Sequence, residues 1–444
     1  MSDPESIDRQ PRIRFRSGRL FTPAKMIAFS FAVVILTGAV LLMLPVSANE
    51  GVKVSFIDAL FTSTSAVCVT GLIAVDTAGT FNVFGRTVVA LLIQIGGLGV
   101  TSIGVGIILI AGKRIGFKQR TLVREAWNVS SFKGIVKLVR AVLLMTLGFE
   151  LCGAVLSFLV FVQDYPAADA IGISVFHSVA AFNNSGFDIL GGLRNLIPYQ
   201  DNILLNLTTC GLIIFGGLGF LVILDIGKAR SFRKLTLHSK VVITMSVVLL
   251  AAGTLILKWT EDITWLGAFF QSTSARTAGF STYPIGNFTN AGLLVLTVLM
   301  FIGASPGSTG GGIKTSTLFV LIQSVKSAAS NQHCQSFKRK IPRDAVSKAY
   351  IIMLLSSALV LGGTFVLCIL EPDNTMMQNL FEITSAFGTV GLSTGITPDL
   401  GPASKLLIVL IMYIGRLGPF TIASLWFIKE KSNVSYSEEL ITIG

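Results

Sequence analysis

The feature that most limits the fold of this chain is a stretch of eighteen residues that occurs four times without gaps. Each copy has phenylalanine at its seventh position, a small residue at its twelfth and glycine at its seventeenth. Glycine makes up 44 of the 444 residues, so one shared glycine would carry little weight, but agreement at all three positions is not expected by coincidence. We therefore interpret the chain as a fourfold repeat. The copies are residues 55–72, 170–187, 263–280 and 375–392, with Phe61, Phe176, Phe269 and Phe381, then Ala66, Ala181, Ser274 and Ala386, then Gly71, Gly186, Gly279 and Gly391.

Each copy lies between two long apolar segments, and the composition suits a membrane. The chain is 52% hydrophobic and 13% charged, with a mean hydropathy of +0.74, whereas soluble domains carry about a quarter charged residues. A helix of about 20 apolar residues crosses the hydrocarbon core. We predict an all-α polytopic membrane protein with eight transmembrane helices and four re-entrant pore helices around a central pore. Residues 1–19 are polar and carry five arginines, so we expect no cleavable signal peptide.

Basic residues account for the net charge of +12, and they are not spread evenly. Most lie in five groups, at residues 9–25, 113–140, 228–240, 326–348 and 429–431, and acidic residues such as Asp76, Asp188 and Asp399 lie in the segments that alternate with them. The positive-inside rule places both termini and the three basic loops in the cytoplasm. Binding of DNA or anionic lipid by a basic patch is the weaker interpretation.

The repeated stretches are too short to span a membrane, because about 13 residues of helix reach roughly 20 Å. A helix followed by glycine-containing extended chain at this depth is a re-entrant loop, which is tolerated where it is buried in protein or lines a water-filled path. Four such loops can form a ring whose backbone carbonyls replace the water of a cation. Glycine permits the backbone conformations that this requires.

Groups for catalysis are sparse. The cysteines Cys68, Cys152, Cys210, Cys334 and Cys368 and the histidines His177, His238 and His333 show no metal-ligand or triad spacing. A multi-pass enzyme would need poised acids, histidine or cysteine. An organic-solute carrier, the other alternative, would more often show two large repeats with broken helices. We therefore expect a transporter that is not an enzyme.

The segments VTGL, AFNNSGF, ARTAGF and SAFGTVGL resemble the Trk/Ktr/HKT superfamily of potassium transporters, and most closely the Ktr membrane subunit. The resemblance covers nearly the whole chain. It implies a K⁺ selectivity filter whose backbone carbonyls bind the ion, with all four glycines present where a serine in the plant branch accompanies Na⁺ selectivity. Cys68 is a small departure from the family pattern. By position the filter would be Cys68, Val69, Thr70 and Gly71; Asn183, Asn184, Ser185 and Gly186; Arg276, Thr277, Ala278 and Gly279; and Gly388, Thr389, Val390 and Gly391.

Polar and flexible residues interrupt the second apolar segment of the third repeat. A proline and three consecutive glycines disfavour a helix there, and we expect the other three repeats to keep a continuous helix at this point. The resemblance implies an intramembrane gating loop at residues 303–314 that obstructs K⁺ at rest; a plain packing kink is the alternative. The gate residues would be Ser305, Pro306, Gly307, Ser308, Thr309, Gly310, Gly311, Gly312, Lys314 and Arg416.

Ionisable residues within membrane segments are candidates for function. Arg416, in mid-segment, is expected below the filter, where its charge would oppose cations. The side chain of Arg276 is expected to point away from the pore in an ion pair that braces the filter, with Glu382 or Glu150 as partner. Asp58 is expected either to favour the positive end of its pore helix or to attract cations.

The domain division that follows from the repeat is a cytoplasmic N-terminus (1–20), four repeats (21–112, 135–227, 239–328 and 344–428), three cytoplasmic loops (113–134, 228–238 and 329–343) and a cytoplasmic C-terminus (429–444). The resemblance implies a homodimer in a bacterial plasma membrane, in contact with lipid and bound to a cytosolic ring of nucleotide-binding, RCK-type regulatory subunits. No GxGxxG follows a strand here, so any nucleotide is expected on that partner, with no covalent cofactor, no nucleic acid and K⁺ as the transported ion, with Na⁺ dependence left open.

Overall fold

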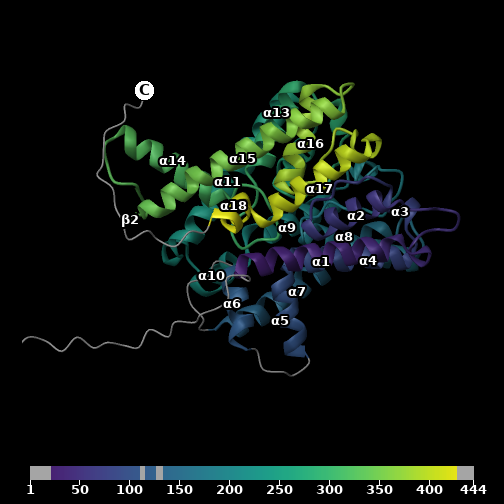
Figure 1. Cartoon of the computed structure of the whole chain (residues 1–444), viewed down its shortest axis with the longest axis horizontal. Helices are drawn as coiled ribbons and strands as arrows, with labels where there is room; N and C mark the ends of the chain where they lie inside the picture. Colours follow the sequence, from purple (N-terminus) through teal and green to yellow (C-terminus); the bar gives the residue numbers. More distant parts are fainter. Residues whose placement is uncertain (1–21, 111–115, 127–133, 428–444) are drawn as a thin grey trace, which may run out of the picture.

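The structure is a computed structural model, and it describes residues 22–110, 116–126 and 134–427. The expected cytoplasmic termini at 1–20 and 429–444, and residues 113–115 and 127–133 of the loop at 113–134, lie outside the described residues. Figure 1 shows a bundle of helices in which the first repeat (purple) lies below the third and fourth repeats (green and yellow).

Each repeat has a long first helix, a short pore helix and a second helix in two parts. The first repeat contains α1 (Pro23–Met43), α2 (Phe56–Cys68), α3 (Thr77–Thr80), α4 (Val83–Leu98) and α5 (Val100–Ile110), followed by α6 (Phe117–Ala126). The second contains α7 (Ile135–Phe161), α8 (Ala167–Phe182), α9 (Ile203–Leu218) and α10 (Phe220–Ala229). The third contains α11 (Leu237–Thr260), α12 (Trp265–Ser274), α13 (Asn290–Phe301) and α14 (Thr315–Ala329). The fourth contains α15 (Arg343–Leu370), α16 (Met376–Gly388), α17 (Pro402–Leu417) and α18 (Pro419–Phe427).

Short elements join these helices. A hairpin of β1 (Gln335–Ser336) and β2 (Arg339–Lys340), paired antiparallel, connects the third repeat to the fourth. The five 3₁₀ turns among the described residues are Pro45–Ser47, Ile197–Tyr199, Phe232–Lys234, Ile285–Asn287 and Thr397–Asp399.

The four first helices, α1, α7, α11 and α15, are long and apolar enough to cross a membrane. They have 21 to 28 residues, and much of their surface is exposed aliphatic side chain suited to lipid. The pore helices are instead 10 to 16 residues long and have mostly buried side chains. A lipid-facing shell around buried, non-spanning helices fits a polytopic all-α membrane protein with re-entrant elements.

Three of the four pore helices begin at a residue whose side chain caps the helix N-terminus. The side chain of Ser55 accepts a hydrogen bond from the backbone of Asp58 at the start of α2, and Thr264 accepts one from Gly267 at the start of α12. A capping box of Thr375 and Gln378 opens α16. These caps satisfy backbone N–H groups that a helix start otherwise leaves without an intrahelical partner.

The prediction that three of the second helices are continuous is wrong. They bend at glycines with positive φ, at Gly99 between α4 and α5, Gly219 between α9 and α10, and Gly418 between α17 and α18. The first two bends measure 99° and 94°. Glycine tolerates this conformation without the steric cost that other residues meet. The third repeat therefore differs from the others in having a loop, rather than a sharp bend, at this point.

Glycines also allow the second helix of a repeat to lie directly on its own pore helix. A Cβ atom on Gly96 would overlap the carbonyl oxygen of Val67, and Gly216 and Gly415 meet Phe182 and Phe387 in the same way. Each second helix then packs on the pore helix of the next repeat: α4 on α8, α9 on α12, α13 on α16, and α17 on α2. The last contact closes the repeats into a ring.

The third copy is offset by one residue from the gapless alignment. Ser63 and Ser272 occupy equivalent places, because Ser63 lies against Gly38 and Ser272 against Gly253, a glycine of the first helix in each repeat. Ser63 is eight residues before its filter glycine, however, and Ser272 is seven residues before its own. Phe270, which is fully buried, replaces the expected Phe269, which is partly exposed. The pore helix of this copy is therefore one residue nearer its glycine.

Candidate ion-conducting site

The four glycines at the seventeenth position form a closed ring. Each one lies against the carbonyl of the residue that precedes the corresponding glycine of the next repeat. A Cβ atom on Gly71 would meet the oxygen of Ser185, one on Gly186 that of Ala278, one on Gly279 that of Val390, and one on Gly391 that of Thr70. The order of contacts is thus first to second to third to fourth and back to the first, with four carbonyl groups held at one level.

The backbone of the ring takes the same form in every repeat. All four glycines have positive φ, at +88°, +67°, +78° and +95°, which strongly favours glycine. The residue two positions earlier is also left-handed: Val69, Asn184, Thr277 and Thr389 have φ of 58°, 59°, 77° and 49°. Left-handed non-glycine residues are uncommon and cost about 1–3 kcal/mol each, so four at matching positions indicate a functional constraint.

Serine hydroxyl groups hold three of the four segments. The Ser65 hydroxyl accepts from Gly71 N at 3.0 Å and donates to Leu72 O, while that of Ser385 accepts from Gly391 N at 3.0 Å. Ser274 Oγ donates to Phe280 O in the third repeat. These serines were not among the predicted site residues, although serine at the eleventh position of the first and fourth copies was a usable signal.

The side chains at the fourteenth position point away from the ring. Cys68 is fully buried, and Asn183 donates to Gln94 of α4 and Glu150 of α7. Arg276 reaches α11, where its guanidinium donates to the Ser246 carbonyl at 3.4 Å and the Ser246 hydroxyl at 3.3 Å.

The predicted ion pair between Arg276 and a carboxylate is wrong for both candidates. Glu382 accepts hydrogen bonds from Ser393, from Thr394 N at 3.1 Å and from Thr397 at 3.0 Å, all in the segment that follows the fourth filter strand. Glu150 and Glu382 therefore each hydrogen-bond to residues of their own repeat, in or just after its filter strand. Neither carboxylate pairs with Arg276 of the third repeat.

Asp58 takes both a local and a long-range partner at the start of α2. Its carboxylate accepts from the Ser55 hydroxyl and forms a 2.9 Å salt bridge with Lys405 of α17. A carboxylate in the first turn favours the positive end of the helix. The contact also ties the first repeat to the fourth, which supports the structural interpretation of this residue.

A cavity of about 360 Å³ opens on one side of the ring, and residues that come after the filter glycines in the chain form much of its wall. Gly71, Gly279 and Gly391 line its floor, and Asn195, Ser281 and Ser393 contribute polar groups to its wall. A hydrated cation could therefore reach three of the four filter strands from this side.

Asp188 lies just beyond the second filter strand, two residues after Gly186. It is 7% exposed and accepts a hydrogen bond from Leu190 N at 3.1 Å. Burial raises the pKa of Asp188 to about 6; the backbone N–H groups of Leu190 and Gly191 and the charge of Arg194 act in the opposite direction, and Asp76 adds to the rise. This carboxyl group therefore changes charge close to neutral pH.

On the other side of the ring lies the predicted gating loop. A Cβ atom on Gly310 would overlap the hydroxyl of Thr277, and one on Gly311 the hydroxyl of Thr389. The loop thus touches the third and fourth strands at the fifteenth position, two residues before the glycines. Its two ends meet in a parallel bridge between Ile302 and Ile313.

Backbone hydrogen bonds dock the loop on the bend of the second repeat. Ser305 N donates to Gly217 O at 3.1 Å, Thr309 N to Gly216 O at 3.3 Å, and Phe220 N to Gly307 O at 3.1 Å. These bonds satisfy polar groups that would be costly to expose in a membrane. The segment is therefore an ordered loop that is hydrogen-bonded to the second repeat, and not a simple kink in a helix.

Both predicted cations contact carbonyl groups of the loop. Arg416 donates to Thr309 O and to Gly96 O, and so connects the loop to the second helix of the first repeat. Lys314 Nζ donates to Gly310 O at 2.6 Å and Gly311 O at 3.2 Å. Both basic side chains lie on the side of the ring where the loop lies.

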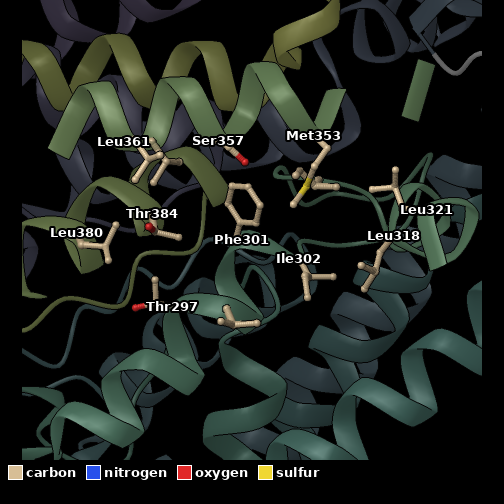
Figure 2. Close-up of a pocket in the computed structure, with 13 residues that line it drawn as sticks. Thr297, Phe301, Ile302, Leu318, Leu321, Met353, Ser357, Leu361, Leu380 and Thr384 are labelled. Carbon is tan, nitrogen blue, oxygen red and sulfur yellow. The ribbon is translucent and has the colours of Figure 1, made fainter. Parts of the chain in front are cut away.

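An apolar cavity of about 390 Å³ lies beside the ends of the loop. Figure 2 shows Phe301 and Ile302 in it, facing Met353, Ser357 and Leu361 of α15. Because its walls are almost entirely hydrocarbon, this cavity cannot supply the oxygens that replace the water of a cation. It is therefore not a candidate for the filter, despite its size.

Comparison with known proteins agrees with this architecture. A family model for TrkH, described as a cation transport protein, matches residues 8–261 and 235–437. The Ktr system potassium uptake protein B of Bacillus subtilis is 39% identical over 438 residues, covering 96% of this chain and 97% of the relative. The potassium/sodium uptake protein NtpJ of Enterococcus hirae is 38% identical over 447 residues, covering 97% and 99%.

A solved structure shares the fold. The potassium transporter TrkH from Vibrio parahaemolyticus superposes with a TM-score of 0.72 at 18% identity, over 92% of this chain and 86% of that chain. The relatives are transporters rather than enzymes, and the match of the family model extends over nearly the whole sequence. This membrane protein belongs to the TrkH family of cation transport proteins, among its Trk/Ktr members.

Proposed function

We propose that this protein takes up K⁺ across the plasma membrane through the ring of filter strands. The observation that carries the proposal is the closed ring of Gly71, Gly186, Gly279 and Gly391, with one carbonyl of each neighbouring strand against each glycine. Rings of carbonyl oxygens replace the hydration shell of K⁺. The names of the relatives, a potassium uptake protein of Bacillus and a potassium/sodium uptake protein of Enterococcus, both include this ion.

The loop at 303–314 acts as the gate in this proposal. Its glycines lie against the side chains of Thr277 and Thr389, two residues before the ring glycines, and Arg416 adds a positive charge on the same side. An ion leaving the ring would have to displace the loop or pass beside it. The proposed resting state is therefore closed.

Uptake of radioactive Rb⁺ into proteoliposomes tests the transport function. Purified protein should support uptake that K⁺ inhibits more strongly than Na⁺ does, and repeating the assay with and without Na⁺ tests a Na⁺ requirement. Uptake of organic solutes without cation flux would instead support a solute carrier.

Control by a separate cytosolic subunit is part of the proposal. Two basic loops form one surface, because Phe232 and Phe337 contact each other with ring centroids 6.3 Å apart. Exposed cations surround this contact: Arg230, Arg233, Lys234, Lys338, Arg339 and Lys340. Setting topology is the other use of these charges, and the aromatic contact favours a docking surface. We expect this surface on the cytoplasmic side, with both termini.

Charge reversal on this surface should weaken binding of the regulatory subunit. The change is Arg233→Glu, Lys234→Glu, Lys338→Glu and Arg339→Glu together, and the measurement is copurification of the partner with membrane protein of normal yield. Lys53→Glu, an exposed lysine on the opposite side of the proposed membrane, is the control. Full copurification by the fourfold variant would contradict the assignment of the surface.

The regulatory nucleotide is expected on that partner, with a homodimer of this chain in a bacterial lipid membrane and no nucleic acid bound. If the purified membrane protein alone responds to ATP or ADP as the complex does, control by the partner is wrong.

Asp188 should give K⁺ uptake a dependence on external pH. Because its pKa is raised to about 6, the carboxyl is mostly ionised at pH 7 and becomes neutral as the pH falls to 5. Loss of this negative charge near the ring should weaken K⁺ attraction and raise the KM for Rb⁺ uptake several-fold over that range. Asp188→Asn should show the high KM already at pH 7, without the acid-dependent rise. The exposed Asp201→Asn is the control, and an unchanged pH profile in Asp188→Asn would exclude this role.

A further inference from the structure

The fourfold repeat identifies one residue that breaks the pattern at the back of the filter. In three repeats a serine of the pore helix donates to a carbonyl of the first helix: Ser63 to Ile35 at 2.6 Å, Ser178 to Glu150 at 2.6 Å, and Ser272 to Leu250 at 3.1 Å. In each case the acceptor stands three residues before the glycine that touches the pore-helix serine, at Gly38, Gly153 and Gly253. Glu150 therefore occupies the place that Ile35 and Leu250 fill with hydrocarbon.

The Glu150 carboxyl is buried, with the residue 8% exposed, and its hydrogen-bonding neighbours are neutral amides. Asn183 Nδ2 lies 3.0 Å from Glu150 Oε1, 2.8 Å from Gln94 Oε1 and 2.9 Å from Val179 O. Gln94 also lies within hydrogen-bonding reach of the carboxyl. A buried carboxyl in a membrane segment is costly and is retained where it has a role.

Asn183 is the first residue of the second filter strand, three positions before Gly186. A Cβ atom on Gly97 of α4 would overlap Asn183 Oδ1, so the amide is enclosed between α4 on one side and α7 on the other. The next residue, Asn184, contacts the hydroxyl of Thr277 in the third strand at 3.3 Å. Any movement of Asn183 would therefore reach the ring.

The hydrogen count shows that this network is tightly specified. The amide nitrogen of Asn183 has two hydrogens but faces three acceptors, and its own oxygen has no partner. A glutamine at position 150 would bring an N–H donor that the Asn183 oxygen could accept. Leucine would leave the two amide hydrogens to Gln94 Oε1 and Val179 O, and would remove the hydrogen bond that joins Asn183 to α7. Without that bond, Asn183 is no longer held to the first helix of its own repeat.

We propose that Glu150 is a positioning residue for ion selectivity, which fixes the second filter strand through Asn183. This inference rests on the proposed filter. The residues equivalent to Asn183 in two other repeats make different contacts: Arg276 donates to Ser246 of α11, and Cys68 is buried. Glu150 thus gives the second strand a hydrogen-bonded brace that its counterparts Ile35 and Leu250 cannot provide.

The test compares Glu150→Leu with Glu150→Gln, measuring Rb⁺ uptake and its inhibition by K⁺ and by Na⁺. Glu150→Leu should lower the preference for K⁺ over Na⁺ by about tenfold, equivalent to about 1.4 kcal/mol, and Glu150→Gln should restore most of it. Thr146→Val is the matched control, because Thr146 lies one turn earlier on α7, is 1% exposed, and its hydroxyl has no hydrogen-bond partner. A general weakening of α7 would affect yield and melting temperature in all three variants, but not selectivity in Glu150→Leu alone.

Gln94→Leu removes the acceptor that the first repeat offers to Asn183. This second variant tests the proposal if Glu150→Leu does not fold. It should shift selectivity in the same direction, and adding it to Glu150→Leu should give less than the sum of the two effects. Unchanged selectivity in folded Glu150→Leu, or in Gln94→Leu where the former does not fold, would overturn the inference. If selectivity also fails to respond to serine at each of the four filter glycines, the proposed filter itself is wrong.

Discussion

Serine in place of Gly71 should lower the preference for K⁺ over Na⁺ by about tenfold or more, a difference of at least about 1.4 kcal/mol. The Cβ atom would overlap the carbonyl oxygen of Ser185, and φ at this position is +88°, which disfavours any side chain. Either the ring opens or the carbonyl turns away, and in both cases the fit to dehydrated K⁺ is lost. The measurement is Na⁺ competition against Rb⁺ uptake.

Gly395→Ser separates this effect from backbone strain. Gly395 follows the fourth filter strand, has φ of +101°, and has no atom within 4 Å of an added Cβ. It should therefore lose some stability while keeping wild-type selectivity. If all four filter glycines accept serine with unchanged selectivity, the assignment of the filter fails.

The ring was predictable from the sequence because its requirement is local. A positive φ disfavours every residue with a side chain, so glycine recurs at Gly71, Gly186, Gly279 and Gly391 whatever surrounds it. The break at residues 303–314 was predictable for the same reason, since proline and glycines destabilise a helix wherever they stand.

What the sequence did not reveal depends on contacts between distant segments. The bends at Gly99, Gly219 and Gly418 were missed because a single glycine within an apolar run is equally compatible with a close helix contact, and Gly96 nearby has that second use. The partner of Arg276 was predicted wrongly because charge complementarity ignores reach, and Ser246 on its own first helix is nearer than either carboxylate. The role of Glu150 required knowing which residues of α1 and α11 occupy equivalent places.

The positions of the Arg416 and Lys314 side chains follow from the carbonyl groups that the loop presents to them. Arg416 and Lys314 donate to carbonyls of the loop, at Thr309, Gly310 and Gly311, so their charges are held on the loop side of the ring while the loop is in place. The bonds that hold the loop to the second repeat, to Arg416 and to Lys314 all involve backbone carbonyls or amides of the loop. Such bonds can be exchanged for water when the loop moves, which makes a reversible gate physically reasonable.

Deleting residues 305–311 should raise K⁺ flux several-fold and make it less dependent on the nucleotide bound by the regulatory subunit. The deletion removes the glycines that touch Thr277 and Thr389 and the carbonyl that accepts from Arg416. Its ends can be joined without stretching the chain, because a Cβ atom on Gly312 would lie 3.2 Å from Gly303 Cα. The measurement is Rb⁺ uptake with the partner present, in ATP and in ADP.

Ser308→Ala is the matched control for this deletion. It removes the hydrogen bond from the Ser308 hydroxyl to Ser305 O and leaves the backbone bonds to Gly216 and Gly217 in place. Its flux and nucleotide response should therefore stay close to those of the wild type. Unchanged or abolished flux in a deletion variant with normal yield and elution volume would remove the loop from the gate, because an obstruction that is taken away must leave a freer path.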